Sequence, residues 1–179
     1  LYIGDTEQRL RQEILLGIGG AEGLEILGIK HCSMHLNEGH AAFAILERIR
    51  DRIQEGTPYP EAIEQVRNTT VFTTHTPVPA GHDVIPFHLM EKYFHAYWPA
   101  LGLDHDAFLQ LGIHPEQPQA GFNLTAFALR MSAYRNGVSK RHGEVSRQMW
   151  QSLWPDASES EVSVDHITNG VHVPTWIEP

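Results

Sequence analysis

Residues 70–83 read TVFTTHTPVPAGHD, a short apolar strand that runs directly into polar residues, and this stretch decides the fold. Val71 and Phe72 lie among threonines, a composition typical of a buried β-strand. The strand signal stops at His75, and the prolines that follow cannot continue a sheet ladder. The stretch therefore predicts a strand over residues 70–74 that brings a histidine to its carboxyl end.

The residues before this strand predict that it lies in a parallel sheet. Residues 31–36 (HCSMHL) are a second strand candidate, and residues 40–53 (HAAFAILERIRDRI) carry apolar side chains at helical spacing. A short helix is expected over residues 61–67. Strand, helix and strand in this order form the βαβ unit of a parallel sheet, because parallel neighbours need a long crossover connection.

The remaining elements fit the same architecture. We expect a helix over residues 7–27 that is broken or weakened by glycines, and four further helices over residues 85–97, 104–112, 124–134 and 139–153. A turn or short strand is expected over residues 135–138, and a last strand over residues 164–168. The sequence thus predicts one α/β segment over residues 1–179, with a parallel, Rossmann-like sheet flanked by helices.

Composition and charge exclude several classes of protein. The chain has 41% hydrophobic and 20% charged residues, and it contains no apolar run close to the roughly 20 residues of a membrane span, so we expect a soluble globular protein without a membrane partner. Its formal charge of -9 argues against a nucleic-acid partner, which requires a basic surface. The single cysteine, Cys32, predicts a cytoplasmic location. Both ends look cut, and we expect a piece of a longer protein.

Polar, turn-forming residues follow the predicted strands at residues 36–40 (LNEGH), 74–77 (THTP) and 168–172 (TNGVH), with a fourth candidate at 136–138 (NGV). The carboxyl ends of parallel strands line the ligand crevice of open α/β sheets, so these ends are predicted to build one polar pocket wall. Asn, Glu, His and Thr offer donors and acceptors with little positive charge, which suits the hydroxyl groups of a sugar. The chain has no GxGxxG loop, no P-loop and no GxSxG elbow.

Other interpretations of these residues stay open. Asn37-Glu38-Gly39 and Asn169-Gly170 are ordinary turn residues. Glu38 could simply favour the start of a helix, and His75 could be a buried histidine with backbone partners. Two histidine groups contain ligand types that zinc accepts, although their spacing matches no known zinc motif. These groups are His31, His35 and His40, and His75, His82 and Asp83.

Four motifs in series resemble the α-glucan phosphorylase family, most closely its bacterial short-form branch. They are HLNEGHAAFAILERIR, FTTHTPVPAGHD, FNLTAFALRMSAYRNGVSKRHGEVSRQMW and ITNGVHVPTW, and the opening residues resemble the family segment just upstream. The resemblance implies the later part of the amino-terminal domain of a two-domain GT-B glycosyltransferase. Such enzymes use inorganic phosphate to release glucose 1-phosphate from the non-reducing end of an α-1,4-glucan.

The resemblance also implies roles for individual residues. His75 matches a histidine whose side chain reaches the glucose 6-hydroxyl and whose carbonyl faces the sugar ring, which makes it the candidate catalytic residue. Asn169 matches an asparagine on the same hydroxyl, and Val138 matches a valine that packs nearby. A loop of the same pocket matches Asn37, Glu38 and His40, with Glu38 in place of the aspartate of longer-form relatives.

The cofactor that the resemblance implies is pyridoxal 5′-phosphate, bound by a lysine of the carboxyl-terminal domain. Lys30, Lys92 and Lys140 match none of its motif, so we expect neither a cofactor-binding residue nor a metal ligand in this chain. The expected partners are the glucan, phosphate, the protein's own carboxyl-terminal domain and further copies of the full-length enzyme. The isolated chain is predicted to be inactive. A metal-dependent hydrolase using His75, His82 and Asp83, or a non-catalytic glucan-binding module, remains the alternative.

Overall fold

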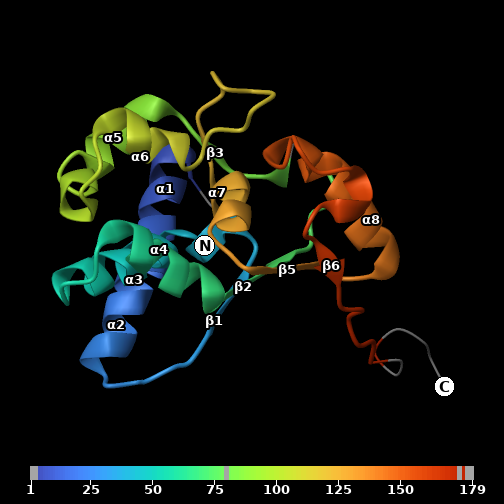
Figure 1. Ribbon diagram of the computed structural model, residues 1–179, viewed down its shortest axis with the longest axis horizontal. Coiled ribbons are helices and arrows are strands. Elements are labelled where there is room, and N and C mark those ends of the chain that lie inside the picture. The colour runs from blue at the N-terminus through green and yellow to red at the C-terminus, as the bar shows by residue number, and fades with distance from the viewer. Residues whose placement is uncertain (1–3, 79–80, 173–174, 176–179) are drawn as a thin grey trace.

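The structure is a computed structural model that describes residues 4–78, 81–172 and 175, so the end of the ITNGVHVPTW motif lies partly outside the described residues. The described chain folds into α-helices joined by short strands (Figure 1). The helices are α1 Thr6–Ile14, α2 Gly20–Ile26, α3 Phe43–Gln54, α4 Tyr59–Asn68, α5 Phe87–Phe94, α6 His105–Gln110, α7 Leu124–Arg130 and α8 Lys140–Trp150. The strands are β1 Met34–Asn37, β2 Thr70–Thr74, β3 Val84–Ile85, β4 Phe122–Asn123, β5 Tyr134–Gly137 and β6 Asp165–His166. Short π- and 3₁₀-helices cover Leu15–Gly19, Gly39–Ala41, Trp98–Leu101, Gln151–Leu153 and Glu159–Glu161.

The main sheet is parallel, as the sequence predicts. Among the described residues it has four strands in the order β1-β2-β5-β6, and every neighbouring pair runs in the same direction. The α3–α4 crossover joins β1 to β2, and the longer crossover from β2 to β5 includes α5, α6 and α7. A separate antiparallel pair, β3 and β4, lies within that second crossover. The expected α/β class is therefore confirmed.

One face of the sheet is covered by the apolar core. Leu36, Phe72 and Arg135 lie side by side in the register of β1, β2 and β5, and all three are buried. The core on this face joins α3, α4, α5 and α7 around a group of phenylalanine rings in contact, in which the ring centres of Phe43 and Phe94 are 4.8 Å apart. Alternation of side chains along a strand places every second residue on the opposite face.

The opposite face is much barer. His35, Val71 and Tyr134 are neighbours in the register, and Tyr134 is 62% exposed. Parallel sheets are normally covered on both faces, because their crossover helices pack on each side. Within the described residues this face has no comparable apolar cover, and Ile167, just beyond β6, is 67% exposed.

The structure corrects the expected elements between residues 124 and 138. Helix α7 ends at Arg130, and Tyr134–Gly137 is a strand, β5, in the middle of the sheet. The turn or short strand expected over residues 135–138 is thus a strand, although Tyr-Arg-Asn-Gly lacks the apolar run typical of an interior strand. Its polar groups find partners instead: the Arg135 guanidinium donates to the carbonyl oxygens of Leu129 and Ser163.

The glycines near the amino terminus do not break the helix. Helices α1 and α2 are joined through a π-helix, Leu15–Gly19, so residues 6–26 are helical throughout. Gly17 is buried at the crossing with α3, where an added Cβ would lie 2.8 Å from the backbone nitrogen of Ala44. Close contact between two helix backbones explains why this position has no side chain.

Other expected boundaries move by a few residues. Strand β1 begins at Met34 rather than His31, Val84–Ile85 is a strand before α5, and β6 is limited to Asp165–His166. The β5–β6 pairing nevertheless continues past the strands, since Ile167 donates to the Gly137 carbonyl. No helix within the described residues combines the length and the apolar character needed to cross a bilayer.

Candidate functional site

The polar residues that follow the strands meet at one edge of the sheet. Asn37 is in register with Thr73, and Thr74 is in register with Gly137. The backbone N–H of Asn169 donates to the carbonyl oxygen of Val138 at 3.0 Å, which places residue 169 beside the end of β5. Because the strands are parallel, the segments after β1, β2, β5 and β6 all leave the sheet at its carboxyl edge. The predicted convergence of these segments is confirmed, while their contact with a ligand stays a prediction.

His75 is held at this edge by the last residue of β1 and by the residue that follows it. Its Nε2 lies 2.9 Å from Oδ1 of Asn37, and a carboxylamide oxygen only accepts, so the ring donates through Nε2–H. The Glu38 carboxylate accepts from the backbone N–H of His75 and, at 3.0 Å, from the hydroxyl of Thr76. His75 is exposed, so the alternative of a buried histidine with backbone partners is wrong.

Glu38 has an unusual backbone conformation, with φ 61° and ψ −175°. This region is essentially restricted to glycine, and a residue held there costs of the order of 1–3 kcal/mol. Gly39 follows directly, and a Cβ on it would lie 3.1 Å from Cβ of Leu124. The turn after β1 is therefore tightly packed on α7. Glu38 does not cap the short helix that follows; its carboxylate contacts the β2 end instead.

A second layer of polar side chains supports the edge from within the sheet. Thr73 lies on the same face as Asn37 and donates its hydroxyl to Oδ1 of Asn136 at 3.0 Å. Its oxygen in turn lies 2.7 Å from Nε2 of His35. Sequence reasoning named Asn136 but missed the role of Thr73. The period-2 alternation of a strand was the available signal, since Thr73 lies two residues before His75.

The β5 edge is shaped by the start of α8. An added Cβ on Gly137 would lie 2.9 Å from Gly143 N and from Nδ1 of His142, so only glycine fits between strand and helix. The Val138 amide donates to the same Nδ1 at 3.2 Å, and Ser139 caps α8 by accepting from the amide of His142. These contacts fix Val138 one residue beyond the strand, next to the end of β2.

His40 lies in a cluster of charged side chains whose other members do not come from the carboxyl edge of the sheet. Its Nδ1 is 3.6 Å from Asp83 and 3.9 Å from the buried carboxylate of Glu13 on α1. The nearby carboxylates of Asp83 and Glu13 raise the pKa of His40 to about 9. Burial raises the pKa of Glu13, whereas for Asp83 burial is outweighed by hydrogen bonds from His40 and Arg9, which lower its pKa. His40 thus pairs with carboxylates, and its predicted place in the glucose pocket stays a prediction.

The cluster was not foreseen from sequence, because its members come from α1, the turn after β1 and the loop before β3. Glu13, His40 and Asp83 are also the group of described residues whose ligand atoms could converge on a metal ion, within 4.8 Å of one another. The Arg9 guanidinium, however, lies 2.7 Å from Asp83 and 3.5 Å from Glu13, and it already supplies positive charge to both carboxylates. The group is therefore an ion-pair cluster.

The alternative metal site of His75, His82 and Asp83 is not assembled. Nδ1 of His82 is 3.0 Å from the hydroxyl of Thr125, and its buried ring contacts Trp150 edge-on. Asp83 pairs with Arg9, and His75 with Asn37. The three side chains have different partners, and the structure does not favour a metal-dependent hydrolase.

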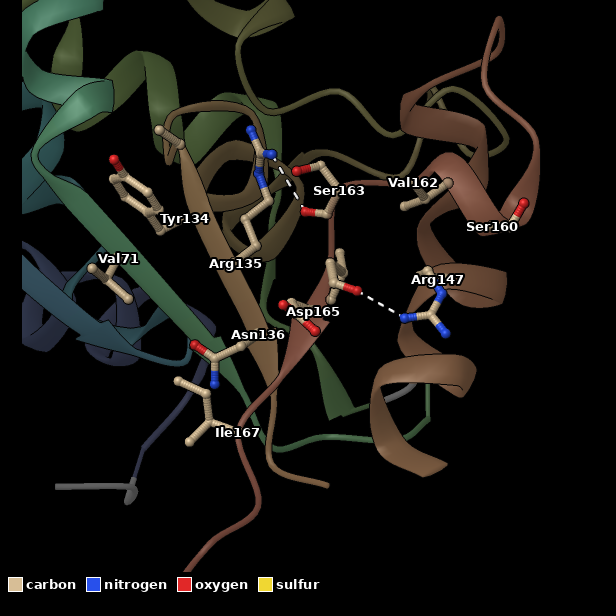
Figure 2. Close-up of a pocket in the computed structure, with 12 residues that line it drawn as sticks. Val71, Tyr134, Arg135, Asn136, Arg147, Ser160, Val162, Ser163, Asp165 and Ile167 are labelled. Atoms are coloured by element: carbon tan, nitrogen blue, oxygen red, sulfur yellow. Dashed lines mark hydrogen bonds between the residues drawn. The ribbon is translucent and has the colours of Figure 1, made fainter. Parts of the chain in front are cut away.

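A pocket of about 650 Å³ lies elsewhere, along β5 and β6 (Figure 2). Val71, Asn136 and Ile167 line the part of the pocket on one side of the sheet. Arg147 and Ser163 line the part on the other side of the sheet. None of the six predicted site residues lines it. It follows the bare face and the open edge at β6, so we attribute it to missing cover on the sheet rather than to the candidate site.

The lysines offer no arrangement that fits pyridoxal 5′-phosphate. Lys92 donates to Glu7 at 2.6 Å, and Lys30 lies with Cys32 and Arg48 near the opposite, amino end of the sheet. Lys140 is exposed at the start of α8. A Schiff base needs a lysine enclosed with phosphate-binding donors, whereas Lys30, Lys92 and Lys140 are all exposed.

The fold and the polar residues at the carboxyl edge of the main sheet together define the class of protein. It is an open, parallel α/β protein with a polar candidate site at the carboxyl ends of its strands. No protein-family model matches the chain. Curated proteins do. The chain is 48% identical to the maltodextrin phosphorylase of Thermococcus litoralis and 44% identical to the glycogen phosphorylase of Aquifex aeolicus, over 99% of its length in each case. It is 41% identical, over its full length, to the glycogen phosphorylase of Mycobacterium tuberculosis.

This agreement along the whole chain confirms the resemblance: the chain belongs to the α-glucan phosphorylase family and corresponds to a segment of its members. It spans only 21%, 25% and 22% of the length of these relatives. The activity of the longer protein is therefore a matter for proposal.

Proposed function

We propose that the longer protein containing this chain is an α-glucan phosphorylase, which transfers the terminal glucose of an α-1,4-glucan to inorganic phosphate and releases glucose 1-phosphate. The observation that carries the proposal is the fixed position of His75 at the carboxyl edge of the sheet, where it is held by hydrogen bonds to Asn37 and Glu38. The names of relatives that match the whole chain support it. The chain would supply the glucose-binding wall, as the later part of the amino-terminal domain.

Each residue of the wall has a proposed contact. The side chains of His75 and Asn169 hold the 6-hydroxyl of the terminal glucose, and Val138 packs against the sugar. Asn37, Glu38 and His40 line the same pocket. Asn37 orients the His75 ring, because its Oδ1 accepts from Nε2–H and leaves Nδ1 as the remaining polar atom of the ring.

The backbone carbonyl of His75 has a proposed role in the reaction itself. Positive charge develops at the anomeric carbon as the glycosidic bond breaks, and a carbonyl dipole aimed at that carbon stabilises it. A carbonyl oxygen fixed by its neighbours gives this stabilisation without acting as a competing nucleophile. His75 is therefore a sugar-holding residue and not a general base.

The rest of the chemistry is assigned to parts outside this chain. Pyridoxal 5′-phosphate, bound to a lysine of the carboxyl-terminal domain, would supply proton transfer through its phosphate. That domain would also bind the substrate phosphate, and the cleft between the two domains would enclose the glucan. We place the full-length enzyme in the cytoplasm as a homo-oligomer.

The test is phosphorolysis of maltoheptaose by the full-length protein, followed as glucose 1-phosphate. Phosphate-dependent release of glucose 1-phosphate is expected, and the isolated 179-residue chain should give none above a buffer control. Release of free glucose without phosphate would point to a hydrolase, and glucan binding without turnover would point to a binding module. Either result from the full-length protein would overturn the proposal.

A further inference from the structure

We propose that Glu38 is a positioning residue, which sets the direction of the His75 carbonyl by holding the backbone on both sides of it. The inference rests on the proposed function, because it concerns how the His75 carbonyl is aimed at the sugar. In addition to its place in the proposed pocket wall, it gives Glu38 an action through the backbone of His75.

The contacts of one carboxylate oxygen carry the inference. Oε1 of Glu38 accepts from the N–H of His75 and, at 3.0 Å, from the hydroxyl of Thr76. The carbonyl of His75 lies between these two donors along the chain, so fixing both donors restricts the dihedral angles that orient it. The side chain of His75 has a different partner, Asn37. The ring and the backbone of His75 are thus held by adjacent residues of the same turn.

The turn that carries the Glu38 carboxylate is held in place on both sides. The Glu38 amide donates to the carbonyl oxygen of Thr73 at 3.0 Å, which extends the pairing of β1 with β2 by one residue. On its other side, Gly39 packs so closely on Leu124 that an added Cβ would come within 3.1 Å. The turn therefore has little freedom to move away from the end of β2.

The backbone of Glu38 shows that the turn alone does not require this side chain. At φ 61° and ψ −175° glycine is the unstrained residue. A glutamate at this position has a strained conformation, while its carboxylate makes two hydrogen bonds to the loop that carries His75. Backbone strain and side-chain function can therefore be separated by substitution.

The experiment compares variants of the full-length enzyme in phosphorolysis of maltoheptaose. Glu38→Ala removes the acceptor and keeps the strain, Glu38→Gly removes the acceptor and relieves the strain, and Glu38→Gln keeps an acceptor oxygen of the same reach. Glu22→Ala, at an exposed position of α2, is the matched control. Thermal unfolding of each variant is measured in parallel.

We expect kcat to fall by on the order of ten- to a hundredfold in both Glu38→Ala and Glu38→Gly, with KM changed by less than about threefold, because the lost interaction acts on the transition state. Glu38→Gln should recover most of kcat. Glu38→Gly should unfold at a higher temperature than Glu38→Ala and still be as slow. A loss of kcat that disappears in Glu38→Gly, or an effect on KM alone, would overturn the inference.

A double-mutant cycle with Thr76→Val gives a second readout. This substitution removes one donor of the loop and should reduce kcat in the native background by a few-fold, but have almost no effect in Glu38→Ala. Independent, multiplicative effects would show that Glu38 does not act through the loop. If the wild-type enzyme shows no phosphorolysis, the proposed function is refuted. If the wild-type enzyme is active but the effects of Glu38→Ala and Thr76→Val are independent, only this inference is refuted.

Discussion

At the scale of single residues, His75 is the position where sequence and structure agree most closely. The strand signal ends one residue before it, and the structure places β2 at Thr70–Thr74 with an exposed His75 next. What the sequence could not show is that Nε2 of His75 meets Asn37, a residue 38 positions away.

His75→Ala in the full-length enzyme should lower kcat/KM for maltoheptaose by roughly ten- to a hundredfold, because one hydrogen bond to a sugar hydroxyl is lost in the transition state. A glucan whose terminal glucose lacks the 6-hydroxyl should show a much smaller difference between variant and wild type. His88→Ala, at an exposed histidine of α5, is the control. Equal losses on both glucans would contradict the proposed contact.

His40 gives a prediction about pH and stability. The nearby carboxylates of Asp83 and Glu13 raise its pKa from 6.5 to about 9, so the folded state binds its proton more tightly than the unfolded state. This stabilisation is fully present below pH 6.5 and is lost as the pH rises through about 9. Arg9, Glu13 and Asp83 all face His40, so the loss reflects the whole cluster.

Urea unfolding of the chain at several pH values would measure this dependence. In His40→Gln, the fall in unfolding free energy between pH 6.5 and 9 should be smaller than in the native sequence. His88→Gln, which changes an exposed histidine, should leave the slope unchanged. Parallel pH profiles for His40→Gln and the native chain would show that the cluster does not hold the proton.

At the scale of elements, the glycines between α1 and α2 differ in what surrounds them. Gly17 is buried against α3, and an added Cβ would lie 2.8 Å from Ala44 N and 2.9 Å from Cβ of Phe43. Around Gly20, by contrast, an added Cβ would meet no atom within 4 Å. Both positions are helical, so their intrinsic preference for alanine over glycine is similar.

Gly17→Ala should therefore destabilise the chain by about 1–3 kcal/mol, because backbone atoms of α3 cannot move aside easily. Gly20→Ala should stabilise it by up to about 1 kcal/mol, through helix propensity alone. Urea unfolding followed by tryptophan fluorescence measures both changes. Stabilisation by Gly17→Ala would mean that the two helices do not approach as closely as the structure shows.

Helices α3 and α4 and strand β2 were predictable because their patterns are strong and local. Strand β5 was expected only as a turn or short strand, because its polar residues have tertiary partners: Arg135 reaches Leu129 and Ser163, and Asn136 reaches Thr73. A polar strand in the middle of a sheet has no periodic signal. The π-helix at Leu15–Gly19 was likewise outside the reach of pattern reasoning, because packing of Gly17 on α3 accompanies it.

At the scale of the whole molecule, the main feature is the sheet face that stays bare within the described residues. Tyr134 is 62% exposed and Ile167 is 67% exposed, and both lie on or beside β5 and β6. Exposed apolar surface on a parallel sheet is typical of an interface. In the longer protein we expect residues outside this chain to cover it.

The isolated chain should therefore self-associate in a concentration-dependent way. Sedimentation velocity should show larger species as the protein concentration rises, and the double variant Tyr134→Lys with Ile167→Lys should shift the distribution towards monomer. Leu27→Lys, at an exposed apolar residue beyond α2, is the control for a general effect of charge. An unchanged distribution in the double variant would place the association surface elsewhere.

The sequence by itself determined the α/β class, the βαβ unit around β2, the family and the polar residues that follow the strands, because these depend on local periodicity and on contiguous motifs. Only the tertiary structure decided that Asn37 and Glu38 bind His75 from the neighbouring strand and that His40 pairs with Glu13 and Asp83. It alone also decided that one sheet face is bare among the residues that the structure describes. Such contacts join residues distant in the chain. Strand order and packing set their geometry, and no local pattern records it.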